Sequence, residues 1–201
     1  HPHQAYRDAQ ESRGLGDVYK RQLYNTILIT AAFYLFFITL RDFFHRKYRN
    51  LSQITAHFSF SILILSILFN NIFSSEVITN LKINETYQAQ NLKINFESIE
   101  QENKQNFKAI KGKFIVEDQS GLIEVMQPEL RIYNQPNIVT SEADIKTNIF
   151  TDKFMTMNYV QNQDYFNIRY QVKPFMIWIW ISTILLCLSG CLSLIRKKYE
   201  N

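Results

Sequence analysis

Three apolar blocks without any Asp, Glu, Lys or Arg constrain this chain more than any other feature. They are residues 23–40, 51–73 and 174–195. Each is about 18 to 23 residues long, which an α-helix needs to cross a hydrocarbon layer of about 30 Å. The mean hydropathy of −0.18 is near neutral because a polar middle separates the blocks. The sequence therefore predicts an integral membrane protein with three transmembrane helices.

Two clusters of basic residues, one between the first two blocks and one after the last, predict the orientation of the chain. The clusters are Arg41, Arg46, Lys47 and Arg49, and Arg196, Lys197 and Lys198. The positive-inside rule places both on the cytoplasmic side, as a loop at 41–50 and a tail at 196–201. Residues 74–173 are then expected outside, in the periplasm or its equivalent. Since topology accounts for the basic residues, the net charge of +4 does not indicate a nucleic-acid partner.

The region expected outside has the periodicity of β-strands. Leu92, Ile94 and Phe96 alternate with polar residues, which is the strand period. Residues 112–116 and 122–126 flank a five-residue turn that ends in Gly121, a pattern typical of a β-hairpin. We therefore predict a small β-rich extracytoplasmic domain at 74–173, inserted before the last helix.

Two other stretches carry local signals. Ser141 and Asp144 have the S-x-x-D spacing of a helix start, which predicts a short helix after them. Residues 1–22 are polar and aperiodic and lack the apolar core of a signal peptide. We interpret them as a disordered or foreign leader.

His57 lies inside the second block, about 9 Å from its first residue. The helical period places Gln53 and Ser61 on the same face as His57. Ser52, Ser59 and Ser66 lie on nearly the opposite face, as a seam of small residues on which helices pack. Ionisable residues within spans often mark functional sites, and imidazole is a strong ligand for haem iron. A structural histidine within the helix bundle is the alternative.

Other chemistries find no support in the sequence. The chain has no Gly-rich phosphate loop, C-x-x-C or H-E-x-x-H motif. Residues 74–173 contain no histidine, which argues against a Ser/His/Asp hydrolase there.

Four stretches, in this order, carry a resemblance to a known family. They are Ala56-His57, residues 127–133 (QPELRIY), residues 141–145 (SEADI) with Asp152, and residues 173–175 (KPF) followed by Trp178 and Trp180. From about Leu51 onward the chain resembles the C-terminal part of CcmF, the haem lyase subunit of bacterial-type cytochrome c maturation. The family typically has glycine where this chain has Ser59. Its tryptophan-rich external motif and second haem ligand have no counterpart here.

The resemblance implies a function and a set of partners. His57 is implied to be an axial iron ligand of a membrane b-type haem (haem b). The chain is implied to be part of a haem lyase (holocytochrome c synthetase) in the bacterial inner membrane, inactive alone, as a fragment or a split subunit. Its periplasmic domain is implied to help deliver or attach haem to apocytochrome c. Implied partners are the rest of the lyase, a haem chaperone, other maturation proteins and apocytochrome c. The alternative is a membrane-anchored extracytoplasmic scaffold, such as a transporter accessory domain, without haem.

Overall fold

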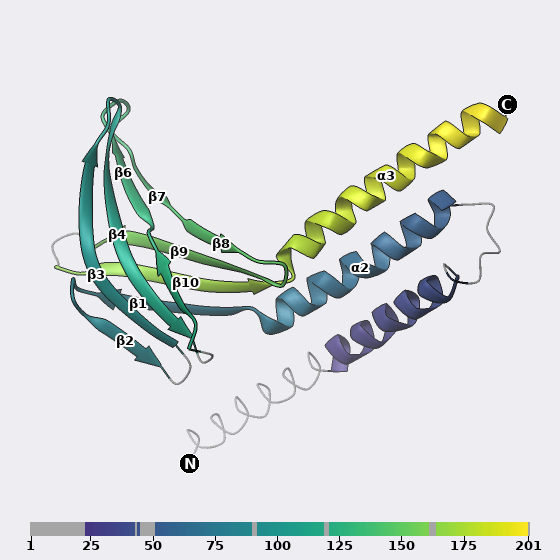
Figure 1. The fold of residues 1–201 in the computed structure, drawn as a ribbon, viewed down its shortest axis with the longest axis horizontal. Coiled ribbons are helices and arrows are strands. Elements are labelled where there is room, and N and C mark those ends of the chain that lie inside the picture. Colours follow the sequence, from purple (N-terminus) through teal and green to yellow (C-terminus); the bar gives the residue numbers. More distant parts are fainter. Residues whose placement is uncertain are drawn as a thin grey trace, which may run out of the picture. The chain divides into compact units, whose positions relative to one another are not determined.

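The computed structural model describes residues 23–42, 44, 51–89, 92–118, 121–160 and 164–200, with side chains as far as residue 195 (Figure 1). It divides into two compact units. One unit holds the helices, within residues 1–72 and 175–201, and the other is a β-domain of residues 73–174. The predicted leader and most of the predicted loop at 41–50 lie outside the described residues.

The helical unit contains the three expected helices. They are Leu23–Asp42, α2 at Leu51–Phe73 and α3 at Met176–Glu200. Each is long and apolar enough to cross a membrane, by length and composition. Ala32 of the first helix packs with Leu65 and Leu68 of α2. The prediction of three apolar helices is therefore confirmed.

The last helix begins later than expected, and a strained residue precedes it. Pro174 is the last residue of a strand, and α3 begins at Met176. Phe175 between them has a φ of 59°. A bulky residue in this left-handed region is a conformational outlier. Its ring packs on Phe69 of α2, with 5.3 Å between ring centroids.

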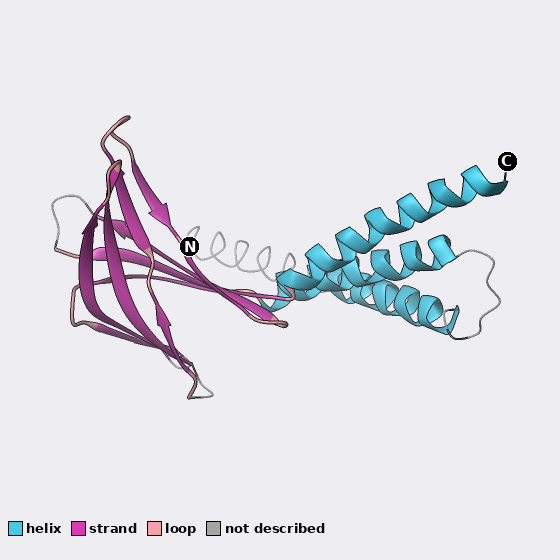
Figure 2. Cartoon of the chain, turned by 45° about the horizontal axis from the view of Figure 1, so that its top comes forward, coloured by secondary structure: helices cyan, strands magenta, loops and turns pink. Residues whose placement is uncertain are grey.

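The β-domain is a sandwich of two antiparallel sheets (Figure 2). Sheet A has the strand order β1-β10-β9-β8. Its strands are β1 Ser75–Leu81, β10 Phe166–Pro174, β9 Thr151–Tyr159 and β8 Asp144–Thr147. Chain entry and exit lie at the same end of this sheet, because Ser75 pairs with Val172.

Sheet B has the order β2-β3-β4-β6-β7, with β5 also paired to β4. Its strands are β2 Thr86–Ala89, β3 Leu92–Asn103, β4 Phe107–Asp118, β5 Ile123–Met126, β6 Glu129–Tyr133 and β7 Val139–Glu142. The β4–β5 hairpin is the one that the sequence predicts. Its turn includes Gly121, whose φ of 75° is readily adopted by glycine.

The core lies between the two sheets, on the faces where alternate apolar side chains point inward. Sheet B contributes Ile94, Phe96, Phe114, Val116, Met126 and Leu130, and sheet A contributes Leu81, Met155, Met157, Ile168 and Tyr170. Phe96 and Phe114 are cross-strand partners whose rings stack with centroids 4.3 Å apart. The prediction of a β-rich domain is confirmed.

The sheets approach closely at Gly112 of β4. A Cβ atom there would lie 2.6 Å from the Phe114 ring and 2.8 Å from Sδ of Met157. Its backbone N–H donates to the Pro128 carbonyl, which joins β4 to the link between β5 and β6. Glycine is therefore needed at this position for close packing rather than for backbone freedom.

The predicted helix after Ser141 is wrong. Residues 139–142 and 144–147 form β7 and β8, and the chain passes from sheet B to sheet A at Ala143. Ser141 Oγ donates to the Met157 carbonyl at 2.8 Å, and Asp144 accepts the Gln127 backbone N–H at 2.7 Å. Both polar side chains thus bond across the two sheets. They do not cap a helix, because their partners lie 16 and 17 residues away in the sequence.

Candidate functional site

A seam of serines joins α2 to α3. Ser52 Oγ donates to the Ser189 carbonyl at 2.8 Å. Seven residues along each antiparallel helix, Ser59 and Ser182 are both fully buried. Ser66 is also buried, as the predicted small-residue face requires. Small side chains allow helix backbones to approach closely, so this face of α2 is already occupied.

His57 lies on the other side of α2, at an exposed position. It makes no hydrogen bond or ion pair within the part of the chain that the structure describes. Gln53, one turn earlier, is exposed on the same face as predicted. Ser61 is instead fully buried, and its hydroxyl donates to the Phe58 carbonyl. Of the two side chains expected on the same face as His57, only Gln53 therefore lies there.

The exposed face of α2 has the spacing of a helix-packing seam. Gln53, His57, Phe60, Ile67 and Asn71 are all exposed and lie near one line along the helix. Intervals of three, four and seven residues place side chains along one such seam. Since the other two sides of α2 contact the first helix and α3, this third side presents the imidazole outward.

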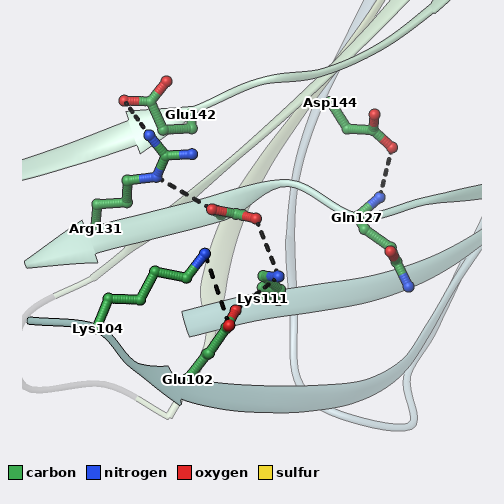
Figure 3. A network of polar contacts seen from close by, with 8 residues as sticks. Glu102, Lys104, Lys111, Gln127, Arg131, Glu142 and Asp144 are labelled. Atoms are coloured by element: carbon green, nitrogen blue, oxygen red, sulfur yellow. Dashed lines mark hydrogen bonds and ion pairs between the residues drawn. The ribbon is translucent and has the colours of Figure 1, made fainter. Parts of the chain in front are cut away.

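A network of charged side chains crosses the outer face of sheet B (Figure 3). Lys111 of β4 lies 2.9 Å from Glu102 of β3 and 3.4 Å from Glu129 of β6. Glu129 also accepts a hydrogen bond from Arg131, which lies 3.9 Å from Glu142 of β7. One network thus ties four neighbouring strands together. Exposed ion pairs of this kind each contribute little to stability. We therefore assign to the network the role of fixing the register of the strands.

The pKa values of Arg131 and Glu102 shift in the directions expected for satisfied ion pairs. Hydrogen bonds to Tyr133 and Glu129 raise the pKa of the Arg131 guanidinium. The hydrogen bond from Lys111, with the charge of Lys104, lowers the pKa of the Glu102 carboxyl. Each shift stabilises the ionised form at neutral pH. Neither Arg131 nor Glu102 is therefore prepared to exchange a proton at neutral pH, which argues against an acid–base role for these two groups.

A second group of charges links the two sheets near Tyr170. Lys153 of β9 lies 2.8 Å from Glu124 of β5 and 3.7 Å from Asp118 of β4. Tyr170 is only 3% exposed. Burial, with the negative charges of Glu124 and Asp118, raises the pKa of the Tyr170 hydroxyl to about 12. The phenol is therefore held in its neutral form.

This shift predicts a loss of stability in alkaline solution. The folded state keeps the Tyr170 proton to a higher pH than the unfolded state, whose tyrosine pKa is about 10. Stability is therefore lost as pH rises from about 10 through about 12. A two-unit difference corresponds to about 2.7 kcal/mol. Urea unfolding at pH 8 and pH 12 should show this loss in the native chain and a smaller loss in Tyr170→Phe. Equal losses in both proteins would contradict the assignment.

Asp152 of β9 has an unsatisfied carboxylate oxygen. The residue is 8% exposed, and its Oδ1 is the buried side-chain atom without a hydrogen-bond partner among the described residues. Its cross-strand neighbours are Thr147 and Lys173. An unmet buried acceptor is costly, so the carboxylate retains capacity for a donor from outside the described residues.

The described residues contain no cluster of three or more His, Cys, Asp or Glu side chains that could enclose a metal ion. A haem iron needs only one or two axial ligands from protein. An exposed imidazole on an apolar helix fits that chemistry for one ligand. His57 is the one histidine among the described residues, because His1, His3 and His45 lie outside them.

The fold places this protein in a class: an antiparallel β-sandwich that lies, in the sequence, between two long apolar helices. Residues 72–174, just over half of the chain, match the family described as CcmF C-terminal beta-sandwich. The chain belongs to this family. The resemblance found in the sequence is thereby confirmed.

Curated relatives agree with this assignment. The chain is 32% identical over 96 residues to the cytochrome c-type biogenesis protein ccl1 of Rhodobacter capsulatus, covering 48% of this chain and 15% of that protein. It is 24% identical over 167 residues to CcmF of Haemophilus influenzae, covering 81% of this chain and 26% of that protein. The chain thus spans about a quarter or less of these relatives.

A solved structure supports the fold. The chain matches a chain titled cytochrome c heme lyase CcmF with a TM-score of 0.54 and 17% sequence identity. The match covers 69% of this chain and 23% of that chain. At this identity the likeness is one of fold.

Proposed function

We propose that this chain is the C-terminal portion of a cytochrome c maturation haem lyase, anchored in the bacterial inner membrane with its sandwich in the periplasm. The observation that carries the proposal is the match of the whole sandwich to the CcmF C-terminal family. The Haemophilus influenzae relative, whose match covers 81% of this chain and therefore includes α2, adds support. The remaining part of the lyase, a haem chaperone, other maturation proteins and apocytochrome c are its proposed partners.

His57 is the proposed axial ligand of a haem b between α2 and a helix outside this chain. The exposed seam of α2 provides a face for such a helix, and the imidazole lies on that face. In this proposal Gln53, one turn away on the same face, would hydrogen-bond one ring nitrogen once haem is bound and leave the other for iron. The bound haem would supply one-electron redox chemistry. The serine seam keeps α2 fixed against α3 while its other side holds the imidazole.

The sandwich has a positioning role in this proposal. Its core is closed by packed aromatic and aliphatic side chains, and many charges on the outer face of sheet B are paired. Both properties favour a rigid support for partners over a catalytic pocket.

A chimera tests the proposal. The chain would replace the corresponding C-terminal region of the Haemophilus influenzae relative, in cells that lack their own lyase. We expect the purified membrane complex to show a reduced b-type haem band and the cells to make cytochrome c. A stable complex that lacks haem and makes no cytochrome c would contradict the proposal and favour the scaffold alternative.

A further inference from the structure

The β8–β9 turn carries two apolar side chains at its tip. Ile149 and Phe150 are 61% and 60% exposed. The backbone N–H of Asn148 donates to the Thr151 carbonyl, and the Asn148 side chain accepts the Phe150 N–H. Turn tips usually carry Gly, Asn, Asp, Pro or Ser. The turn is held by its hydrogen bonds, so formation of the turn does not explain why two large apolar residues lie at its tip.

The strand register fixes which end of the sandwich carries this tip. Thr151 pairs with Pro174, the last residue of β10, and α3 begins two residues later at Met176. Cross-strand partners lie about 5.5 Å apart, and two residues of chain span at most about 7 Å. Chain connectivity alone therefore keeps Phe150 within roughly 16 Å of the first residue of α3.

The first turns of α3 have the composition of a membrane interface. Trp178 and Trp180 lie there, and Trp180 is 62% exposed. Tryptophans are enriched where a span meets the headgroup layer. Lys146 lies close to the tip in the sequence, on β8, with a side chain that is 49% exposed. A lysine beside apolar side chains is suited to lipid phosphates.

We propose that Ile149 and Phe150 insert into the lipid interface beside the start of α3, as a third membrane contact of the sandwich in addition to its two chain ends. The partner is a phospholipid surface, with the apolar side chains among the upper acyl chains and Lys146 at the phosphates. This proposal rests on the proposed membrane placement of α3. Its consequence is mechanical: a sandwich attached only through its two chain ends is free to tilt, whereas a third contact restricts its orientation.

Fluorescent labels test the insertion. Single cysteines would be placed at Ile149, Phe150 or Tyr159, with Cys187 and Cys191 replaced by Ala, and labelled with an environment-sensitive dye. The full chain would be reconstituted in vesicles of phosphatidylcholine and phosphatidylglycerol. Tyr159 is the matched control, because it is 56% exposed and lies at the other end of β9. Eight residues of strand separate it from Thr151, about 27 Å.

We expect nitroxide-bearing lipids to quench the labels at Ile149 and Phe150 and to leave the label at Tyr159 unquenched. Phe150→Asp should abolish the quenching of a label at Ile149. Tip labels that iodide in solution quenches as readily as the label at Tyr159 would overturn the proposal. Tip labels shielded from both quenchers would also overturn it, because protein would then cover the tip.

A label at Leu188 of α3, which is 52% exposed, separates this proposal from the one on which it rests. Quenching of that label by nitroxide lipids together with unquenched tip labels would overturn the insertion alone. An unquenched label at Leu188 would instead overturn the membrane placement of α3 and, with it, the insertion.

Discussion

Replacing His57 with alanine is expected to remove the b-type haem band from the assembled lyase while the protein still inserts into the membrane. Alanine suits an apolar helix, and His57 makes no hydrogen bond or ion pair among the described residues that the substitution would break. The substitution should therefore affect haem binding and leave the contacts within the protein intact. Removing a group that hydrogen-bonds to a metal ligand lowers metal affinity by about 10- to 100-fold. Removing the ligand itself should lower haem affinity by more than this. The measurement is the haem content and reduced spectrum of the purified complex.

Asn71→Ala provides the matched control. Asn71 is also polar and exposed near the same line of α2, and it lies about 21 Å farther along the helix. A variant that merely weakened the docking of a neighbouring helix would behave similarly at either position. We expect haem to be kept in Asn71→Ala, lost in His57→Ala and partly restored to His57→Ala by imidazole in solution. Haem content and spectrum unchanged in His57→Ala would contradict the ligand assignment.

The helices and the nature of the middle domain could be predicted because their signals are local. Uncharged blocks of sufficient length predict apolar helices, and the alternation of Leu92, Ile94 and Phe96 predicts a strand. The Gly121 turn likewise predicts the β4–β5 hairpin. Each of these signals is complete within a few residues. No knowledge of distant partners is needed to interpret them.

The S-x-x-D motif shows where local reasoning failed. Ser141 and Asp144 have the spacing of a helix start, but their hydrogen bonds go to Met157 and Gln127. Serine and aspartate favour any backbone conformation in which their side chains find hydrogen-bond partners. The passage of the chain from one sheet to the other provides such partners as well as a helix start does. Only the pairing of β7 with β6 and of β8 with β9 decides between them. That pairing is not visible in a short window of sequence.

The candidate site was predictable in part for a similar reason. The helical period correctly separates the serine seam from the face that carries Gln53 and His57. It wrongly assigns Ser61 to that open face, because the first helix covers α2 on the side where Ser61 lies. A helical wheel gives angles around one helix. It does not give the direction from which a second helix approaches.

Gly112→Ala is expected to destabilise the sandwich by about 3 kcal/mol, near the upper end of the usual range for overpacking a core. The added Cβ would overlap the ring of Phe114, which cannot retreat because it stacks on Phe96. It would also overlap Sδ of Met157 in the opposite sheet. For a domain of about 100 residues, this loss lowers the melting temperature by roughly 12 to 24 °C. Thermal unfolding followed by protease sensitivity of the β-domain measures it.

Gly121→Ala separates close packing from backbone freedom. A Cβ at Gly121 meets nothing within 4 Å, but its φ of 75° disfavours alanine, so a smaller loss of about 1 kcal/mol is expected. Met157→Ala removes one of the two atoms that oppose the new methyl group at Gly112. The double variant Gly112→Ala with Met157→Ala should therefore be more stable than the sum of the two single losses predicts. If Gly112→Ala destabilises no more than Gly121→Ala, or if the two single losses simply add, the sheets do not meet at Gly112 as closely as the structure places them.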